Sequence, residues 1–160
     1  MISALVHGTE HHQTQPLSPG STMSIEYKVN TSITTDQFVE LLEDSTLGGR
    51  RPLEDRACME GMLLNSNLVV SAWDCGMLVG IARSMTDFHY ACYLSDLAVS
   101  KKYQKTGIGK KLQILTQRQL GPWCKLILIA APAADSYYGH IGYTRNQRCW
   151  ILEPESSISG

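Results

Sequence analysis

The sequence lacks the features that would direct it to a membrane, a secretory route or a nucleic acid. Its longest strongly apolar run, residues 126–131, is far shorter than the ~20 residues that span a bilayer. The first ten residues combine neither a basic start nor a long apolar stretch, so we expect no secretory signal. The formal net charge of -1 gives no overall attraction to nucleic acid or anionic lipid. We therefore expect a cytoplasmic protein that binds neither nucleic acid nor membrane.

The cysteines indicate neither a metal site nor a set of disulfides. Five cysteines are scattered along the chain, and no two of them form a Cys-x-x-Cys pair. Zinc sites and disulfide frameworks both depend on recurring cysteine spacing, and neither is predicted here. Cys92 lies in an apolar run and is predicted to be a small core residue. We expect no bound metal ion.

Length and composition are those of one ordinary folded unit. The chain has 160 residues, of which 43% are hydrophobic, enough for a packed core. Residues 1–22 are rich in polar and turn-forming residues without periodicity, and they are predicted to be a flexible N-terminal extension. Residues 23–160 are predicted to form a single domain.

Hydrophobic periodicity predicts alternating strands and helices. Thr34 and Gln37 have the spacing of a capping box, which predicts the start of the first helix. Gly121 and Pro122 predict the end of the helix at 107–120. The expected order is strand 25–29, helix 34–46, helix 53–66, strands 68–73, 77–85 and 90–99, helix 107–120, strand 125–131, helix 134–141 and strand 143–152. This pattern predicts an α+β sandwich, with a mostly antiparallel sheet and helices on both faces.

One segment carries the chemical signal. The strand at 90–99 runs into a loop containing Gly107 and Gly109, after which an amphipathic helix begins at once. Unpaired amides at a helix start bind anions, above all phosphate. Five lysines concentrate positive charge there: Lys101, Lys102, Lys105, Lys110 and Lys111. The spacing fits neither the P-loop pattern nor the dinucleotide-binding pattern, because residue 104 is glutamine and residue 112 is leucine.

Three motifs resemble the GNAT superfamily, the Gcn5-related N-acetyltransferases. The stretch from Gln104 to Gly109 matches the family's Q/R-x-x-G-x-G/A loop. The stretch from Ser95 to Val99 is similar to its fourth strand, and Tyr138 to Tyr143 matches its late Y-x-x-x-G-[FY] motif. The order of elements agrees over about residues 25–152.

The resemblance implies that acetyl-coenzyme A is the acetyl donor. Main-chain amides of the loop would hold its diphosphate, which implies the residues Gln104, Lys105, Thr106, Gly107, Ile108, Gly109 and Lys110. The fourth strand would bulge and separate from the fifth, so that Leu97, Ala98 and Val99 pair with the pantetheine arm. The Leu97 amide would also stabilise the oxyanion that forms on the thioester.

The resemblance further implies a general acid but leaves the general base open. Tyr138 matches the tyrosine that protonates the departing thiolate, although Tyr137 is an adjacent competitor. The positions at which relatives place a base hold Tyr93 and Ser95 here. The remaining candidates for the base are Asp87, His89, Asp96 and His140, with a water relay or an already neutral amine as the alternative.

The acceptor pocket of the family implies Arg50 and Arg51 as substrate-binding residues, and Trp73, Phe88 and Arg145 as further neighbours. Adjacent arginines suit a carboxylate, so an amine with an anionic group, on a small molecule or a peptide, is expected. Two other interpretations remain: a non-catalytic acyl-coenzyme A sensor, and a nucleic-acid module built on the lysines. The apolar residues 149–152 favour a homodimer.

Overall fold

The computed structural model describes residues 24–159, and the predicted extension of residues 1–22 lies outside them. The strands are β1 (Glu26–Val29), β2 (Leu68–Asp74), β3 (Met77–Thr86), β4 (Ala91–Val99) and β5 (Lys125–Ile127). The helices are α1 (Thr35–Asp44), α2 (Arg56–Leu64), α3 (Ile108–Gln117) and α4 (Asp135–His140), with 3-10 turns η1 (Gly48–Arg50), η2 (Lys101–Tyr103) and η3 (Pro132–Ala134). Among the described residues, no helix is long and apolar enough to cross a membrane.

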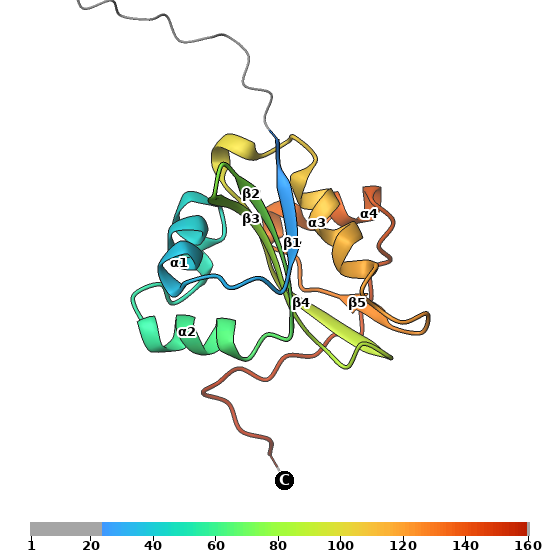
Figure 1. Cartoon of the computed structure of the whole chain (residues 1–160). Coiled ribbons are helices and arrows are strands. Elements are labelled where there is room, and N and C mark those ends of the chain that lie inside the picture. Colours follow the sequence, from blue (N-terminus) through green and yellow to red (C-terminus); the bar gives the residue numbers. More distant parts are fainter. Residues whose placement is uncertain (1–23, 160) are drawn as a thin grey trace, which may run out of the picture.

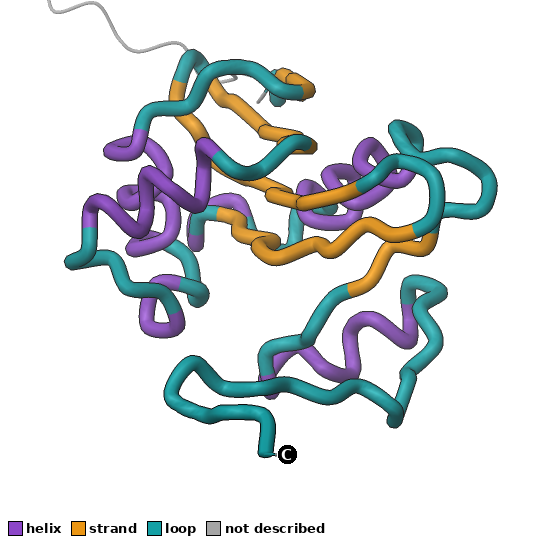
Figure 2. The backbone as a smooth tube through the Cα atoms, turned by 90° about the horizontal axis from the view of Figure 1, so that it is seen from below, coloured by secondary structure: helices purple, strands orange, loops and turns teal. Residues whose placement is uncertain are grey.

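The strands form one sheet in the order β1-β2-β3-β4-β5, antiparallel except for the parallel pair β4–β5. Helices α1 and α2 lie on one face, and α3 and α4 lie on the other (Figure 1). The predicted α+β sandwich with helices on both faces is therefore confirmed. Seen from below, β5 leads away from the rest of the sheet into the loop before α4 (Figure 2).

Each face of the sheet carries its own core. Phe38 and Leu42 of α1 and Met59 of α2 are buried against one face. Ile108 and Leu112 of α3 are buried against the other face, with Leu68 and Val70 of β2 and the predicted core residue Cys92 among their neighbours. Helix α3 approaches β3 closely, because a Cβ at Gly80 would lie 3.1 Å from both the Ile108 and the Leu112 side chains. The glycine thus sets how near α3 sits to the strands.

Local sequence signals account for the start of the first helix. The Thr34 side chain accepts the Gln37 amide at 3.2 Å, and the Gln37 side chain accepts the Thr34 amide at 3.0 Å. This is the capping box that the sequence predicted. Asp55 caps α2 in the same manner by accepting the Cys58 amide at 2.9 Å.

The predicted last strand is wrong. Residues 143–152 contain no strand, and the strand predicted at 125–131 ends at Ile127. Five consecutive polar residues, 144–148, give the segment no alternating apolar face with which to pair on a sheet. The side chain of Trp150 is 92% exposed. Within the described residues, β5 is consequently an edge strand.

Candidate active site

The sheet opens between its two parallel strands. β4 pairs with β5 only from Ala91 to Tyr93, opposite Lys125 to Ile127. Beyond that point β4 continues to Val99, while the chain after β5 turns away toward η3. From Leu94 onward, β4 has a strand neighbour on one side only among the described residues. Main-chain groups on its other edge can therefore pair with an extended ligand.

A β-bulge lies at the mouth of this opening. Ser84 of β3 pairs with Leu94, whereas Arg83 pairs with Asp96, so Ser95 has no partner on β3. A bulge reverses which side chains face which side of a sheet. Leu94 accordingly belongs to the α3 core, whereas Ala98 belongs to the core under α1. The predicted bulge in this strand is present at Ser95.

The loop from β4 to α3 is held by its own side chains. The Gln104 amide group donates to the Val99 carbonyl at 3.0 Å, and the Thr106 hydroxyl donates to the Tyr103 carbonyl at 2.6 Å. Lys105 and Gly107 both have positive φ, 62° and 91°. Gly107 is the N-cap of α3 and supplies no side-chain cap. The first amides of α3 are thus presented without a competing side-chain acceptor, as an anion site requires.

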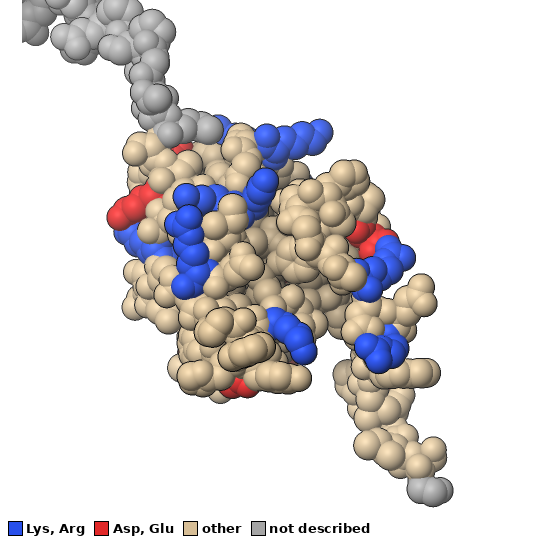
Figure 3. All heavy atoms as spheres, turned by 90° about the vertical axis from the view of Figure 1, so that its right-hand side faces the viewer, with Lys and Arg blue, Asp and Glu red and all other residues tan. Residues whose placement is uncertain are grey.

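Positive charge surrounds this helix start. Lys101, Lys102, Lys105, Lys110 and Lys111 are all exposed. Figure 3 shows basic side chains around a hollow on the side of the molecule that carries α3 and α4, with few acidic side chains among them. The local field therefore favours a polyanion although the whole chain is nearly neutral.

A small pocket of about 110 Å³ gathers five of the residues that the sequence singled out: Arg50, Arg51, Ser95, Leu97 and Tyr138. They come from η1, the loop after it, β4 at and beyond its bulge, and α4. Burial, and to a smaller degree the neighbouring Tyr137, raises the pKa of the half-buried Tyr138 phenol. The phenol therefore carries its proton at neutral pH. Tyr137 does not line this pocket.

The Arg51 guanidinium is already engaged within the protein. Its Nε donates to Asp96 Oδ1 at 2.7 Å, and its Nη2 donates to the Ser95 carbonyl at 2.8 Å. The second carboxylate oxygen of Asp96 accepts from Arg83 Nε at 2.5 Å. Asp96 is 1% exposed. Both carboxylate oxygens are already bound by guanidinium groups and the side chain does not line the pocket, so Asp96 does not suit the role of base.

The other candidates for the base lie elsewhere. Asp87 accepts three main-chain amides in the β3–β4 turn, chiefly those of Tyr90 and Ala91, and these bonds lower its pKa to about 2. His89 and His140 are exposed. None of these side chains lines the small pocket, whose lining contains no carboxylate and no histidine. Trp73, Phe88 and Arg145, the further neighbours expected from sequence, do not line it either.

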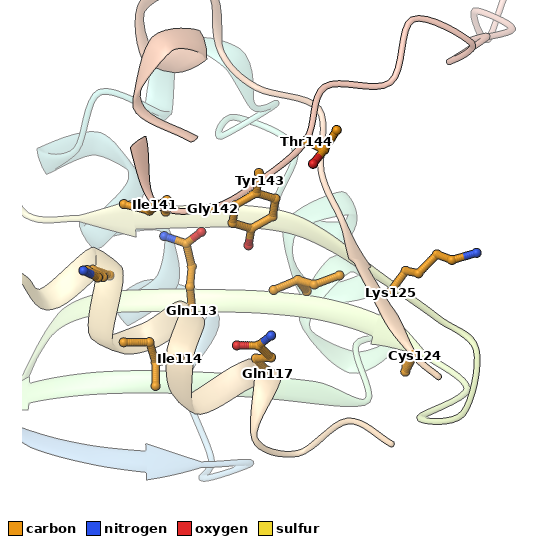
Figure 4. Close-up of a pocket in the computed structure, with 11 residues that line it drawn as sticks. Gln113, Ile114, Gln117, Cys124, Lys125, Ile141, Gly142, Tyr143 and Thr144 are labelled. Atoms are coloured by element: carbon orange, nitrogen blue, oxygen red, sulfur yellow. The ribbon is translucent and has the colours of Figure 1, made fainter. Parts of the chain in front are cut away.

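A larger cavity of about 370 Å³ lies between α3 and residues 141–144 (Figure 4). Gln113 and Gln117 of α3 and Tyr143 line it, with Lys110 at the helix start. Within the described residues, Gln113 Oε1 and the Tyr143 hydroxyl make no hydrogen bond to protein, and burial strongly raises the pKa of Tyr143. Sequence reasoning missed this cavity. The spacing of two glutamines four residues apart on one face of the helix was the available signal.

Comparisons with known proteins identify the family. The model of the acetyltransferase (GNAT) domain matches residues 50–149, and the chain belongs to this family of acetyltransferases. The uncharacterized N-acetyltransferase ycf52 of Gracilaria tenuistipitata var. liui is 26% identical over 123 residues, which cover 72% of this chain and 68% of the relative.

Two solved structures illustrate the likeness in fold. SA2161 from meticillin-resistant Staphylococcus aureus superposes with a TM-score of 0.60 at 23% identity, over 84% of this chain and 98% of the other. The aminoglycoside N-acetyltransferase AAC(6')-Iy, solved in complex with coenzyme A, gives a TM-score of 0.64 at 16% identity, over 87% and 99%. At these identities the comparison establishes the shared fold alone.

Proposed function

We propose that this chain transfers the acetyl group of acetyl-coenzyme A to the amine of a small molecule or a peptide. The observation that carries the proposal is the small pocket in which Leu97, Tyr138 and two arginines meet beside the opened β4 edge. The coenzyme A complex of the similarly folded AAC(6')-Iy supports the donor. The residues present suit both the diphosphate and the pantetheine arm of that donor.

The diphosphate of the donor fits the start of α3. Amides from Lys105 to Lys110 lie in the loop and the first turn of α3, where Gly107 has positive φ and the helix start has no side-chain cap. The exposed lysines add a favourable field. We assign the loop from Gln104 to Lys110 to this role, with the Gln104 side chain fixing the loop to β4. The amide groups of the pantetheine arm would pair with main-chain groups of Leu97, Ala98 and Val99.

The acetyl transfer itself is a direct attack in a ternary complex. The amine nitrogen forms a bond to the thioester carbonyl carbon, and the carbon–sulfur bond breaks. The Leu97 N–H donates to the carbonyl oxygen as it gains negative charge, a contribution of about 2.7–4 kcal/mol for a donor of this kind. Tyr138 donates its phenolic proton to the departing sulfur.

The proton lost by the amine has no evident acceptor among the side chains that line the pocket. We propose that water takes the first proton of an ammonium group, or that the amine binds in its neutral form; in both cases the N–H proton released after the attack passes to water. A pocket lined by Arg50 and Arg51, with no carboxylate, disfavours an ammonium group and lowers the pKa of a bound amine. It also favours an acceptor with an anionic group.

The absence of a base from the pocket lining also supports a second candidate, a non-catalytic sensor of acyl-coenzyme A. Titration calorimetry with coenzyme A, followed by an acceptor screen that measures free thiol, separates the two. The enzyme binds coenzyme A and releases thiol with at least one amine, whereas the sensor binds without turnover. Failure to bind coenzyme A contradicts both. A homodimer is a further proposal, tested by light scattering of the purified chain.

A further inference from the structure

We infer that Arg83 and Asp96 are positioning residues that hold the Ser95 bulge, and with it the Leu97 amide, in place for acetyl transfer. The inference rests on the function proposed above. It assigns these two buried side chains a part in the reaction although neither lines the small pocket. We call Arg51, Arg83 and Asp96 the bulge clamp.

The bulge clamp is an ion-pair cluster that runs inward from the pocket, which Arg51 lines, to the buried side chains of Arg83 and Asp96. Arg83 and Asp96 face one another across β3 and β4, and their side chains are 4% and 0% exposed. Arg83 Nε lies 2.5 Å from Asp96 Oδ2, while Arg51 Nε donates to Asp96 Oδ1 at 2.7 Å. Both oxygens of the carboxylate are therefore occupied, and its orientation is fixed.

Both guanidiniums also grip the bulged residue. Arg83 Nη2 donates to the Ser95 hydroxyl at 2.9 Å, and Arg51 Nη2 donates to the Ser95 carbonyl at 2.8 Å. Ser95 has no partner on β3, so the ladder does not hold it. One arginine fixes its side chain and the other its main chain. Leu97 follows two residues later, so its direction depends on how the bulge is held.

The bulge clamp is itself anchored to the opposite layer. Arg83 Nη1 donates to the Met62 carbonyl at 3.0 Å and to the Ser66 hydroxyl at 2.8 Å. Its guanidinium lies 5.9 Å from the centre of the Phe38 ring. The cluster thus ties β3 and β4 to the end of α2. A buried ion pair stabilises a fold no better than well-packed apolar side chains do, so stability alone does not explain this placement.

The charge of the cluster suits the reaction as well. Two guanidiniums face one carboxylate, which leaves a net positive charge directly behind Ser95. Positive charge held close to the Leu97 amide stabilises an oxyanion that forms there, and it does so without reorganisation during the reaction. The bulge clamp therefore both orients the Leu97 amide and adds positive charge near the oxyanion.

The test compares turnover with donor binding in the full chain. Asp96→Asn and Arg83→Lys are expected to lower kcat at least about tenfold, while the Kd for coenzyme A rises by a smaller factor, because the loop and α3 that hold the diphosphate are untouched and only the pantetheine contacts near Leu97 are disturbed. Asp36→Asn is the matched control, since it breaks the exposed ion pair with Arg56 and leaves kcat unchanged. A folded Asp96→Asn variant with wild-type kcat overturns the inference.

A variant of Ser95 tests the same inference if neither Asp96→Asn nor Arg83→Lys folds. Ser95→Ala removes the bond from Arg83 Nη2 and keeps every ion pair, and Ser95→Thr keeps the hydroxyl. We expect kcat to fall about threefold or more in Ser95→Ala at unchanged coenzyme A affinity, with recovery in Ser95→Thr. Unchanged turnover in Ser95→Ala contradicts the inference. If the wild-type chain itself neither binds coenzyme A nor releases thiol, the proposed function fails instead.

Discussion

The hydroxyl of Tyr103 donates a 2.6 Å hydrogen bond to Asp74 and so joins two segments far apart in the chain. Tyr103 ends η2, in the loop that leads to α3, whereas Asp74 ends β2. The bond to Asp74, followed by burial, raises the pKa of the Tyr103 phenol. The loop assigned to the diphosphate is thereby fastened to the β2–β3 hairpin.

Tyr103→Phe removes this fastening and keeps the buried ring. We expect the Kd for coenzyme A to rise a few fold, about three- to tenfold, because the loop amides lose part of their preorganisation. Titration calorimetry measures the change. Tyr90→Phe is the control, because the exposed Tyr90 hydroxyl only accepts a long hydrogen bond from Lys125 Nζ, at 3.5 Å. An equal effect of both variants would show that the bond to Asp74 does not organise the loop.

Tyr138→Phe tests the general acid. The variant is expected to lower kcat about 10²-fold or more while the Kd for coenzyme A is retained, because only proton donation is lost. Burial raises the pKa of Tyr138, so any loss of kcat through ionisation of this phenol should occur at a more alkaline pH than for a solvent-exposed tyrosine. Tyr137→Phe changes the neighbouring ring outside the pocket and serves as control. Wild-type turnover in Tyr138→Phe would remove the assignment.

Arg50→Ala tests the anionic acceptor. Arg50 is exposed at the pocket, whereas Arg51 is committed to Asp96 and Ser95. We expect Arg50→Ala to raise KM about tenfold for an acceptor that carries a carboxylate, with little change for its uncharged amide or ester analogue. Steady-state kinetics with such a matched pair of acceptors measures the difference. Equal changes in KM for the two acceptors would mean that Arg50 does not bind the anionic group.

The sequence predicted the features that are encoded locally. The capping box at Thr34 and Gln37 formed as expected, because both partners lie within one helical turn. The β2–β3 hairpin turns at Cys75 and Gly76, with φ of 48° and 82°, in the gap between the strands predicted at 68–73 and 77–85. The expectation that Leu97 and Tyr138 share one site came from the resemblance to the GNAT superfamily and not from a local pattern, and both residues line the small pocket.

Contacts between distant segments were not predictable in the same way. Asp96 and Arg51 lie 45 residues apart, and nothing in their local patterns indicates that they pair. The sequence therefore left Asp96 among the candidates for the base. The strand predicted at residues 143–152 is a different case, because the polar run 144–148 could have been recognised in the sequence as lacking an alternating apolar face.

Gly107 and Gly109 are both motif glycines, yet the structure makes different demands on them. Gly107 has φ of +91°, whereas a Cβ at Gly109 would meet Val99 Cγ2 at an ordinary 3.7 Å. Gly107→Ala is expected to cost about 1–2 kcal/mol, which lowers Tm by several degrees, and to weaken coenzyme A binding. Gly109→Ala should keep Tm within about one or two degrees. Thermal unfolding with and without coenzyme A measures both, and equal Tm losses would contradict the distinction.

Asp87 gives the fold a dependence on pH that lies outside the site. Its Oδ1 accepts the amides of His89, Tyr90 and Ala91 at 2.8–3.0 Å and closes the β3–β4 turn. These bonds, led by that of Tyr90, lower its pKa from 3.8 to about 2. The folded state therefore favours the ionised carboxylate. Its stabilising contribution is complete above the unfolded value of 3.8 and is lost as the pH falls through about 2.

Asp87→Asn removes the charge and keeps an oxygen acceptor. We expect the variant to have a lower Tm than the wild type at neutral pH, with a difference that shrinks below about pH 4 and becomes small as the pH reaches about 2, where the wild-type carboxylate is itself becoming protonated. Asp44→Asn, an exposed position at the end of α1, controls for the change in net charge. Thermal unfolding across this range measures the three proteins. A Tm difference that stays constant from pH 7 to pH 2 would show that the turn depends on shape and not on the ionised group, because only an ionised acceptor loses its advantage on protonation.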